Sequence, residues 1–168
     1  GEVPDRAWYD RHGVPVARDG ARPFARWVVR EQGKVELGNV ACAMCHTRVM
    51  PDGTIILGAQ GNFPFDRIFA DDIPNIPPPV MPLVVQGLVG APWDAEGTAR
   101  LRAMSLADFR AAWNAIPPGV IARQGTSVFV PPAVPDLIGI ADRRYLDKTG
   151  LGRHRGIADV MRYAAMNQ

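Results

Sequence analysis

The chain has 168 residues, of which 47% are apolar and 21% are charged, and this balance fits one globular domain rather than a disordered chain. Its 19 Lys and Arg residues are interspersed with 17 Asp and Glu residues, so the net charge is only +2 and no basic stripe suited to nucleic acid is visible. No apolar run approaches the ~20 residues that cross a bilayer, and the start of the sequence lacks the basic and apolar stretches of a signal peptide. We therefore expect no transmembrane segment, and a chain that is either mature or a fragment.

The first part of the sequence predicts an arm followed by a single domain. Residues 1–21 are polar and rich in Gly, Pro and Arg, which predicts an extended arm lying over a domain formed by residues 22–168. Within 23–33, apolar residues recur at spacings of three and four behind an initial Pro. This pattern predicts a helix that turns Phe24 and Trp27 toward the core.

The middle of the sequence predicts long loops and a second helix. Residues 47–100 alternate Pro-rich segments with short apolar runs, which predicts loops with room for one hairpin. Ser105 and Asp108 have the spacing of a capping box, and apolar residues follow at helical spacing until Pro117. Residues 117–150 then return to loop.

A third helix is predicted from Arg155 or Gly156 to Gln168, with Ile157 and Met161 on its apolar face. Neither Gly nor Pro closes this helix, so we expect the native polypeptide to continue beyond it. With 16 Pro and 17 Gly, the regular elements should be short and widely separated. The sequence thus predicts a mainly α, small helical domain with long Pro/Gly-rich loops.

Both cysteines lie in the motif Cys42-Ala-Met-Cys45-His46. Two intervening residues let the thiols reach two vinyl groups of one porphyrin, and a His directly after the second Cys falls under the iron. The motif therefore predicts one covalent haem c attached through Cys42 and Cys45, with His46 as the proximal iron ligand.

Three other interpretations of this motif are weaker. A structural zinc site needs four ligands, but only His12 and His154 remain, far apart in the sequence and unpaired. A thioredoxin-like dithiol needs a strand and a helix start in a βαβ setting, which the flanking sequence does not predict. Chance occurrence is the third alternative.

The last third of the chain resembles the closing segment of a haem domain in the di-haem cytochrome c peroxidase family. The residues that carry this resemblance are Val134-Pro-Asp-Leu137-Ile-Gly139, Arg144-Tyr145-Leu146 and Gly156-Ile-Ala-Asp-Val-Met161-Arg-Tyr163. In that family a Pro-x-Leu-x-Gly turn precedes a tyrosine-containing loop and a helix bearing or neighbouring the distal methionine. With the attachment motif and the segment before it, the resemblance covers about a third of the chain and implies a cytochrome c-like helical fold around one haem.

The sequence also departs from that family. The family carries two attachment motifs per chain, and this sequence has one. The family's His-Asp-Gly in the tyrosine loop is replaced here by Leu146-Asp147-Lys148-Thr149-Gly150. A complete two-haem peroxidase is therefore excluded for this chain.

The sixth iron ligand decides whether the iron transfers electrons or binds small molecules. Met44 and Met50 are too close to His46 to cross the porphyrin ring, and Met104 beside a helix cap is most simply core filler. The resemblance places Met161 first. The alternatives, in order, are Met166, then Met81, and then His154, His12 or an open site.

The leading hypothesis is electron transfer through a His/Met-ligated haem to a redox partner protein or complex. The alternatives are a haem domain of a larger peroxidase-like oxidoreductase, or a haem-binding sensor or haem subunit of a redox complex. The chain is expected to be an electron carrier rather than an enzyme by itself. Because haem c is attached after export, we expect a periplasmic location or the extracellular side of a bacterial membrane.

Overall fold

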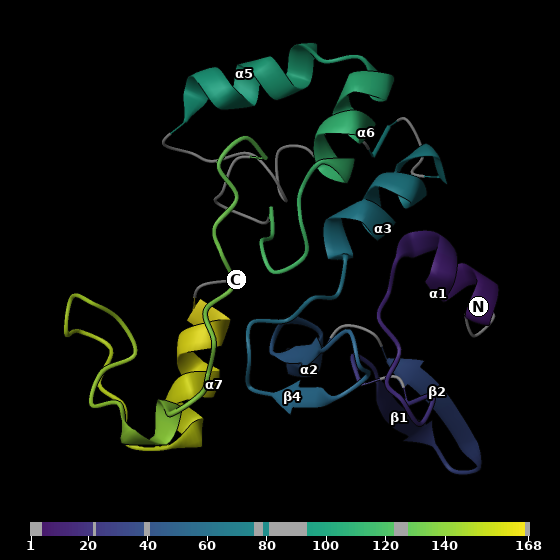
Figure 1. Cartoon of the computed structure of the whole chain (residues 1–168). Coiled ribbons are helices and arrows are strands. Elements are labelled where there is room, and N and C mark those ends of the chain that lie inside the picture. The colour runs from purple at the N-terminus through teal and green to yellow at the C-terminus, as the bar shows by residue number, and fades with distance from the viewer. Residues whose placement is uncertain are drawn as a thin grey trace. The chain divides into compact units, whose positions relative to one another are not determined.

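The computed structural model describes residues 5–21, 23–38, 41–75, 79–80, 94–122 and 128–166 (Figure 1). The chain divides into two compact units, Gly1–Asp136 and Leu137–Gln168, where the sequence predicted a single domain for 22–168. We call these the first and second units. None of the described helices is long and apolar enough to cross a membrane.

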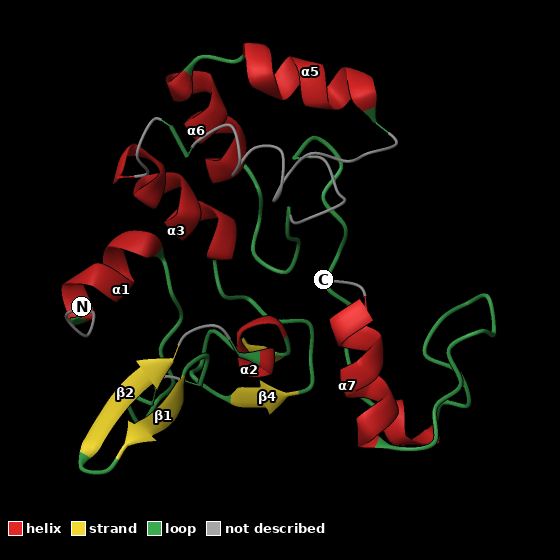
Figure 2. Ribbon diagram, turned by 180° about the vertical axis from the view of Figure 1, so that it is seen from behind, coloured by secondary structure: helices red, strands yellow, loops and turns green. Residues whose placement is uncertain are grey.

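The first unit mixes helices with two small sheets. In chain order its elements are α1 (Arg6–His12), β1 (Arg26–Glu31), β2 (Lys34–Gly38), α2 (Cys42–Cys45), β3 (Thr47–Val49), β4 (Ile55–Leu57), α3 (Phe65–Asp72), η1 (Ile73–Asn75), α5 (Ala95–Ala103) and α6 (Leu106–Asn114). Strands β1 and β2 pair antiparallel (Figure 2), and β3 pairs antiparallel with β4. The expectation of a mainly α, cytochrome c-like helical domain is therefore wrong, and the fold is mixed α/β.

The first hairpin lies where the sequence predicted a helix over 23–33. Short apolar runs fit both the helical and the strand period, and the β-branched Val28 and Val29 favour the strand. Gly33 decides between them, because it closes the hairpin turn with a φ of +82°, a left-handed conformation that glycine adopts without steric cost. Trp27, predicted to face the core, is 73% exposed instead.

The predicted N-terminal arm contains a helix. The carboxylate of Asp5 accepts from the backbone N–H of Trp8 at 2.7 Å and so caps α1, and Gly13 ends the helix with a φ of +68°. Tyr9 and His12 are buried, so tertiary packing stabilises a helix too short to persist alone. Sequence periodicity over seven residues is too brief to predict such an element.

The long segment 47–100 holds more regular structure than expected. Strands β3 and β4 form the one hairpin for which the sequence left room. The helices α3 and α5 were not predicted, because the neighbouring Pro-rich segments masked their short apolar patterns.

The main core lies where α3, α5 and α6 meet. The prediction of a second helix is confirmed, since the Ser105 hydroxyl accepts from the N–H of Asp108 at 3.1 Å and α6 follows. Trp113 of α6 is 1% exposed, and its ring lies 4.6 Å from that of Phe69 and 5.9 Å from that of Phe109. The buried residues of this core are Ala70, Ile73, Leu101, Phe109, Trp113, Ile116, Ala122 and Val128.

The second unit contains η3 (Ile140–Asp142), an irregular loop and α7 (Ile157–Met166). The prediction of a helix starting near Gly156 is confirmed to within a residue or two. Its apolar face, however, is not packed in a core: Ile157 is 72% exposed and Met161 is 66% exposed. No described side chain from Leu137 to Ala165 is buried.

Candidate functional site

The Cys42–Cys45 segment folds as a single helical turn, α2. The backbone N–H of His46 donates to the Cys42 carbonyl at 2.9 Å and closes this turn. Side chains three residues apart on a helix lie on the same face, so the two cysteines emerge on one side. Cys42 is exposed, Cys45 is half-buried, and the two do not form a disulfide.

Two glycines after the second hairpin hold the backbone of this turn. The N–H of Gly61 donates to the Cys45 carbonyl at 2.7 Å, and the N–H of Gly58 donates to the His46 carbonyl at 2.7 Å. A Cβ on Gly61 would lie 2.5 Å from the Cys45 carbonyl oxygen, so only glycine allows this approach. The turn thus has a fixed backbone although it contains only four residues. Figure 2 shows α2 beside β4 in this arrangement.

A side chain amide extends this bracing to β3. The Asn62 Oδ1 accepts from the N–H of Val49 at 3.0 Å, and its Nδ2 donates to the Val49 carbonyl at 2.8 Å, as a neighbouring strand would. Met44, inside the motif, is buried, and so is Thr47 directly after His46. The residues between and beyond the cysteines therefore anchor the turn, while Cys42 is exposed.

The segment 117–122, which follows α6, packs against Gln60 and Gly61. The Gln60 Nε2 donates to the Gly119 carbonyl at 2.8 Å. Gly119, with a φ of +90°, approaches Gly61 so closely that a Cβ would lie 3.1 Å from the Gly61 carbonyl oxygen. This contact links residues 117–122 to the segment 58–61, whose backbone N–H groups hold the cysteine turn.

A buried carboxyl group lies beside Ala122, at the end of the segment 117–122. Asp66, in the first turn of α3, is 2% exposed, and its Oδ2 accepts from the N–H of Ala122 at the long distance of 3.4 Å. Its Oδ1 has no hydrogen-bond partner. Burial disfavours the charged form and raises the pKa of Asp66 to about 7, and the Ala122 N–H offsets only part of this. No motif in the sequence predicted a role for Asp66. A lone acid within the apolar run Phe63-Pro-Phe-Asp-Arg-Ile-Phe69 is the signal that was there to find.

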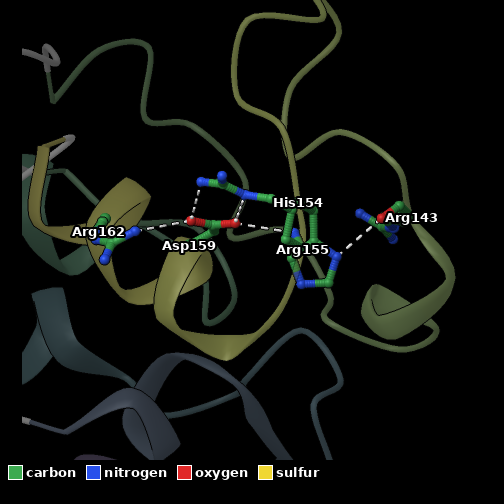
Figure 3. A network of polar contacts seen from close by, with 5 residues as sticks. All are labelled: Arg143, His154, Arg155, Asp159 and Arg162. Carbon is green, nitrogen blue, oxygen red and sulfur yellow. Dashed lines mark hydrogen bonds and ion pairs between the residues drawn. The ribbon is translucent and has the colours of Figure 1, made fainter.

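The two remaining histidines differ in what their rings offer. In His12, Nδ1 lies 2.8 Å from the Trp8 carbonyl and Nε2 lies 3.1 Å from the Asp71 carboxylate, so both nitrogens face acceptors. In His154, Nδ1 lies 2.9 Å from the Arg143 carbonyl, which can only accept (Figure 3). His154 therefore presents the lone pair of Nε2, the arrangement found in metal-ligating histidines, whereas both ring nitrogens of His12 are engaged.

The ring of His154 is held by a tightly bonded loop. The N–H of His154 donates to the Arg144 carbonyl at 3.0 Å, and Tyr145 pairs with Arg153 in an antiparallel bridge. Within the loop, the Asp147 carboxylate accepts from the Thr149 hydroxyl and from the backbone N–H groups of 149, 150 and 152, at 2.6 to 2.9 Å. The Thr149 hydroxyl contributes most to lowering the pKa of Asp147, and the backbone donors add to it.

Helix α7 begins with a second acidic anchor (Figure 3). The Arg155 backbone N–H and guanidinium both bond to the Asp159 carboxylate at 3.0 to 3.1 Å, and the Arg162 guanidinium bonds to it at 3.1 Å. These arginine contacts, led by the side-chain bond from Arg155, lower the pKa of Asp159. The network fixes the first turn of α7 directly after His154.

The predicted methionine ligands are placed as follows. Met161 lies on the exposed face of α7, and Met50 follows β3 at 36% exposure. Met104 packs against the main core, which confirms its interpretation as filler. Met81 and the side chain of Met166 lie outside the described residues.

The α2 turn and the residue after it carry two thiols and an imidazole, the donors that a covalent haem would use. Among the described residues, no three His, Cys, Asp or Glu side chains gather into a group that could hold a metal ion. The helix that bears the cysteines ends at Cys45 and leads into a hairpin, whereas a thioredoxin-like site needs a helix that continues into a βαβ unit. Two thiols on one face followed by an imidazole remain as a set that a porphyrin iron can use.

Comparison with known proteins adds no relative: the chain matches no protein-family model, no curated protein and no solved structure.

Proposed function

We propose that this chain carries one covalent haem c, held by Cys42 and Cys45 with His46 as the proximal iron ligand, and that it exchanges electrons with a redox partner protein. The observation that carries the proposal is the α2 turn, which presents two thiols on one face and is braced by the Gly58 and Gly61 N–H groups. When bound, haem supplies a one-electron iron couple whose potential depends on its ligands and on burial.

Covalent attachment of haem requires that the two cysteine thiols be reduced and accessible. Each S–H adds across one vinyl double bond, with sulfur bonding to one carbon and hydrogen to the other, so no oxidant or reductant is consumed. Cys42 is exposed and the two cysteines form no disulfide, which supports the proposal. Because thioether formation with haem follows export, we place the chain in the periplasm or on the extracellular side of a bacterial membrane.

The sixth ligand is proposed from two side chains. Met161 is the prediction from sequence, and thioether ligation raises the potential in a way that suits an electron carrier. His154 is favoured by a specific observation, because its Nδ1 is bonded to the Arg143 carbonyl and its Nε2 lone pair is presented. Either ligand closes the iron to small molecules and supports electron transfer over peroxide chemistry.

Haem attachment is tested by expressing the chain with an export signal in a host that matures c-type cytochromes. We expect the purified protein to gain the mass of one haem and to keep haem stain on a denaturing gel. The double variant Cys42→Ser, Cys45→Ser should lose the stain, and the control variant Met50→Ala should keep it. Haem that acid acetone extracts from the wild type, or no haem at all, would refute the proposal.

The sixth ligand is tested on the same preparation by absorption and electron paramagnetic resonance spectra. Met161→Ala should remove the weak red charge-transfer band of the ferric form if methionine is the ligand. If histidine is the ligand, the wild type should show no such band, and His154→Ala should change its spectrum. Free binding of cyanide or carbon monoxide by the wild type would instead favour the haem domain of a peroxidase-like oxidoreductase.

A further inference from the structure

Asp66 is a carboxyl group that the fold buries with few hydrogen-bond donors to compensate its charge. It is 2% exposed, one oxygen has no partner, and the other has a single long bond to the Ala122 N–H. A buried carboxylate lowers the stability of the fold unless a cation or several hydrogen-bond donors compensate its charge. A group built in this way holds a proton near neutral pH and releases it readily.

Among the residues that the structure describes, no charged side chain accounts for this environment. On α3, the charged neighbours Arg67, Asp71 and Asp72 are exposed, and Asp71 is engaged with His12 and Arg110. The segment Gly119–Ala122 carries no ionisable side chain. Burial is the main cause of the raised pKa of about 7, and the Ala122 N–H opposes it.

Asp66 and its hydrogen-bond partner Ala122 both lie a few residues from the contact between Gly61 and Gly119, and Gly61 holds the cysteine turn. Five residues before Asp66, the Gly61 N–H is bonded to the Cys45 carbonyl, and three residues before Ala122, Gly119 lies against Gly61 and accepts from Gln60. Five extended residues span at most about 18 Å, so Asp66 lies within that distance of Gly61, whose N–H contacts the Cys45 carbonyl. A change of charge at the cysteine turn changes the electrostatic potential at a poorly solvated carboxyl group.

We propose that Asp66 is the proton-binding group coupled to electron uptake at the haem of the α2 turn. This inference rests on the proposed function. When a one-electron donor reduces the iron from Fe(III) to Fe(II), the site loses one positive charge, and the Asp66 carboxylate takes up one proton from solvent. Reoxidation by the partner protein releases that proton.

The size of the coupling follows from Coulomb's law. Two unit charges about 15 Å apart, at an effective dielectric constant of about 20, change a proton affinity about sixfold. For a one-electron couple this corresponds to a fall of about 45 mV in midpoint potential as the pH rises through neutrality. The pKa of Asp66 is then higher in the ferrous form than in the ferric form.

The experiment measures the midpoint potential of the haem protein against pH on both sides of pH 7. We expect the wild type and the control Asp72→Asn, an exposed acid of the same helix, to show this fall, and Asp66→Asn to show a constant potential. A fall that persists in Asp66→Asn, or a constant potential in the wild type, would overturn the inference while leaving haem attachment intact. Absence of haem refutes the proposed function itself.

A second readout needs no variant that might misfold. Redox-difference infrared spectra of the wild type should show a protonated carboxyl band that appears on reduction near neutral pH and shifts in deuterated water. A redox-difference spectrum with no such band would contradict proton uptake by a buried carboxyl group.

Discussion

The two units of this chain are stabilised by different physical means. The first unit buries aromatic and aliphatic side chains between α3, α5 and α6, and a second small cluster between α1 and β3. The second unit, in the residues that the structure describes, buries no side chain and depends on hydrogen bonds to Asp147 and Asp159. Buried apolar area stabilises cooperatively, whereas exposed ion pairs contribute little and are screened by salt. We therefore expect the first unit to unfold globally and the second to open locally.

The largest effect should come from the centre of the main core. Trp113→Ala removes a side chain that is 1% exposed, and we expect it to lower the free energy of unfolding by about 3–5 kcal/mol. Trp27→Ala, at a site 73% exposed, is the matched control and should change it by less than about 0.5 kcal/mol. Urea unfolding measures both. Equal losses would mean that the hairpin of β1 and β2, rather than the helical core, stabilises this unit.

The next effect tests the glycine that braces the cysteine turn. Gly61→Ala places a Cβ against the Cys45 carbonyl, so we expect a loss of about 1–3 kcal/mol and poorer haem attachment. Gly156→Ala, where the Cβ meets open space, is the control in the second unit. Unfolding curves and haem content per chain report the two consequences. An unchanged haem content in Gly61→Ala would show that attachment does not need this backbone contact.

Asp66 should make the stability of the first unit depend on pH. Its pKa of about 7 when folded is above its ordinary value of 3.8, so between these values the unfolded chain binds fewer protons than the folded one and stability falls as pH rises. Above pH 7 the full penalty is present, on the order of 4 kcal/mol for a pKa raised by about three units, and Asp66→Asn should then stabilise the protein by the part of this that burying the amide does not offset. Unfolding at acidic and alkaline pH measures this. A variant that is less stable than the wild type at alkaline pH would contradict the assignment of a buried, poorly compensated carboxyl group.

A smaller effect should follow from the cap of α6. Ser105→Ala removes the hydroxyl that accepts from the Asp108 N–H, and we expect a loss of about 1 kcal/mol. Ser105→Asp keeps an acceptor at this position and should recover most of the stability. Thermal unfolding is sufficient to compare the three proteins.

The smallest global effect should come from the second unit. Asp147→Ala removes the acceptor for the loop, so we expect faster amide exchange at Gly150 and Gly152 and an unchanged global unfolding midpoint. Because the pKa of Asp147 is lowered, the wild-type loop should remain protected above the ordinary carboxyl range and lose protection as pH falls through this lowered pKa. A large fall in the global midpoint would show that the two units unfold together.

The sequence by itself determined the elements whose signals are local. The Ser105 capping box and the apolar spacing after it predicted α6, and the start of α7 was placed to within a residue or two. The spacing of Cys42, Cys45 and His46 predicts haem attachment directly, because the two residues between the cysteines set the distance between the thiols locally. Haem attachment itself stays a prediction.

Only the tertiary structure decided the rest. Whether residues 26–38 pair as strands depended on the turn at Gly33, because their short apolar run fits either period. The bracing of the cysteine turn by Gly61, and the burial of Asp66 against Ala122, bring together residues 16 and 56 positions apart. No local pattern encodes such contacts, since they arise only when the chain packs and each polar group must find its partner or remain without one.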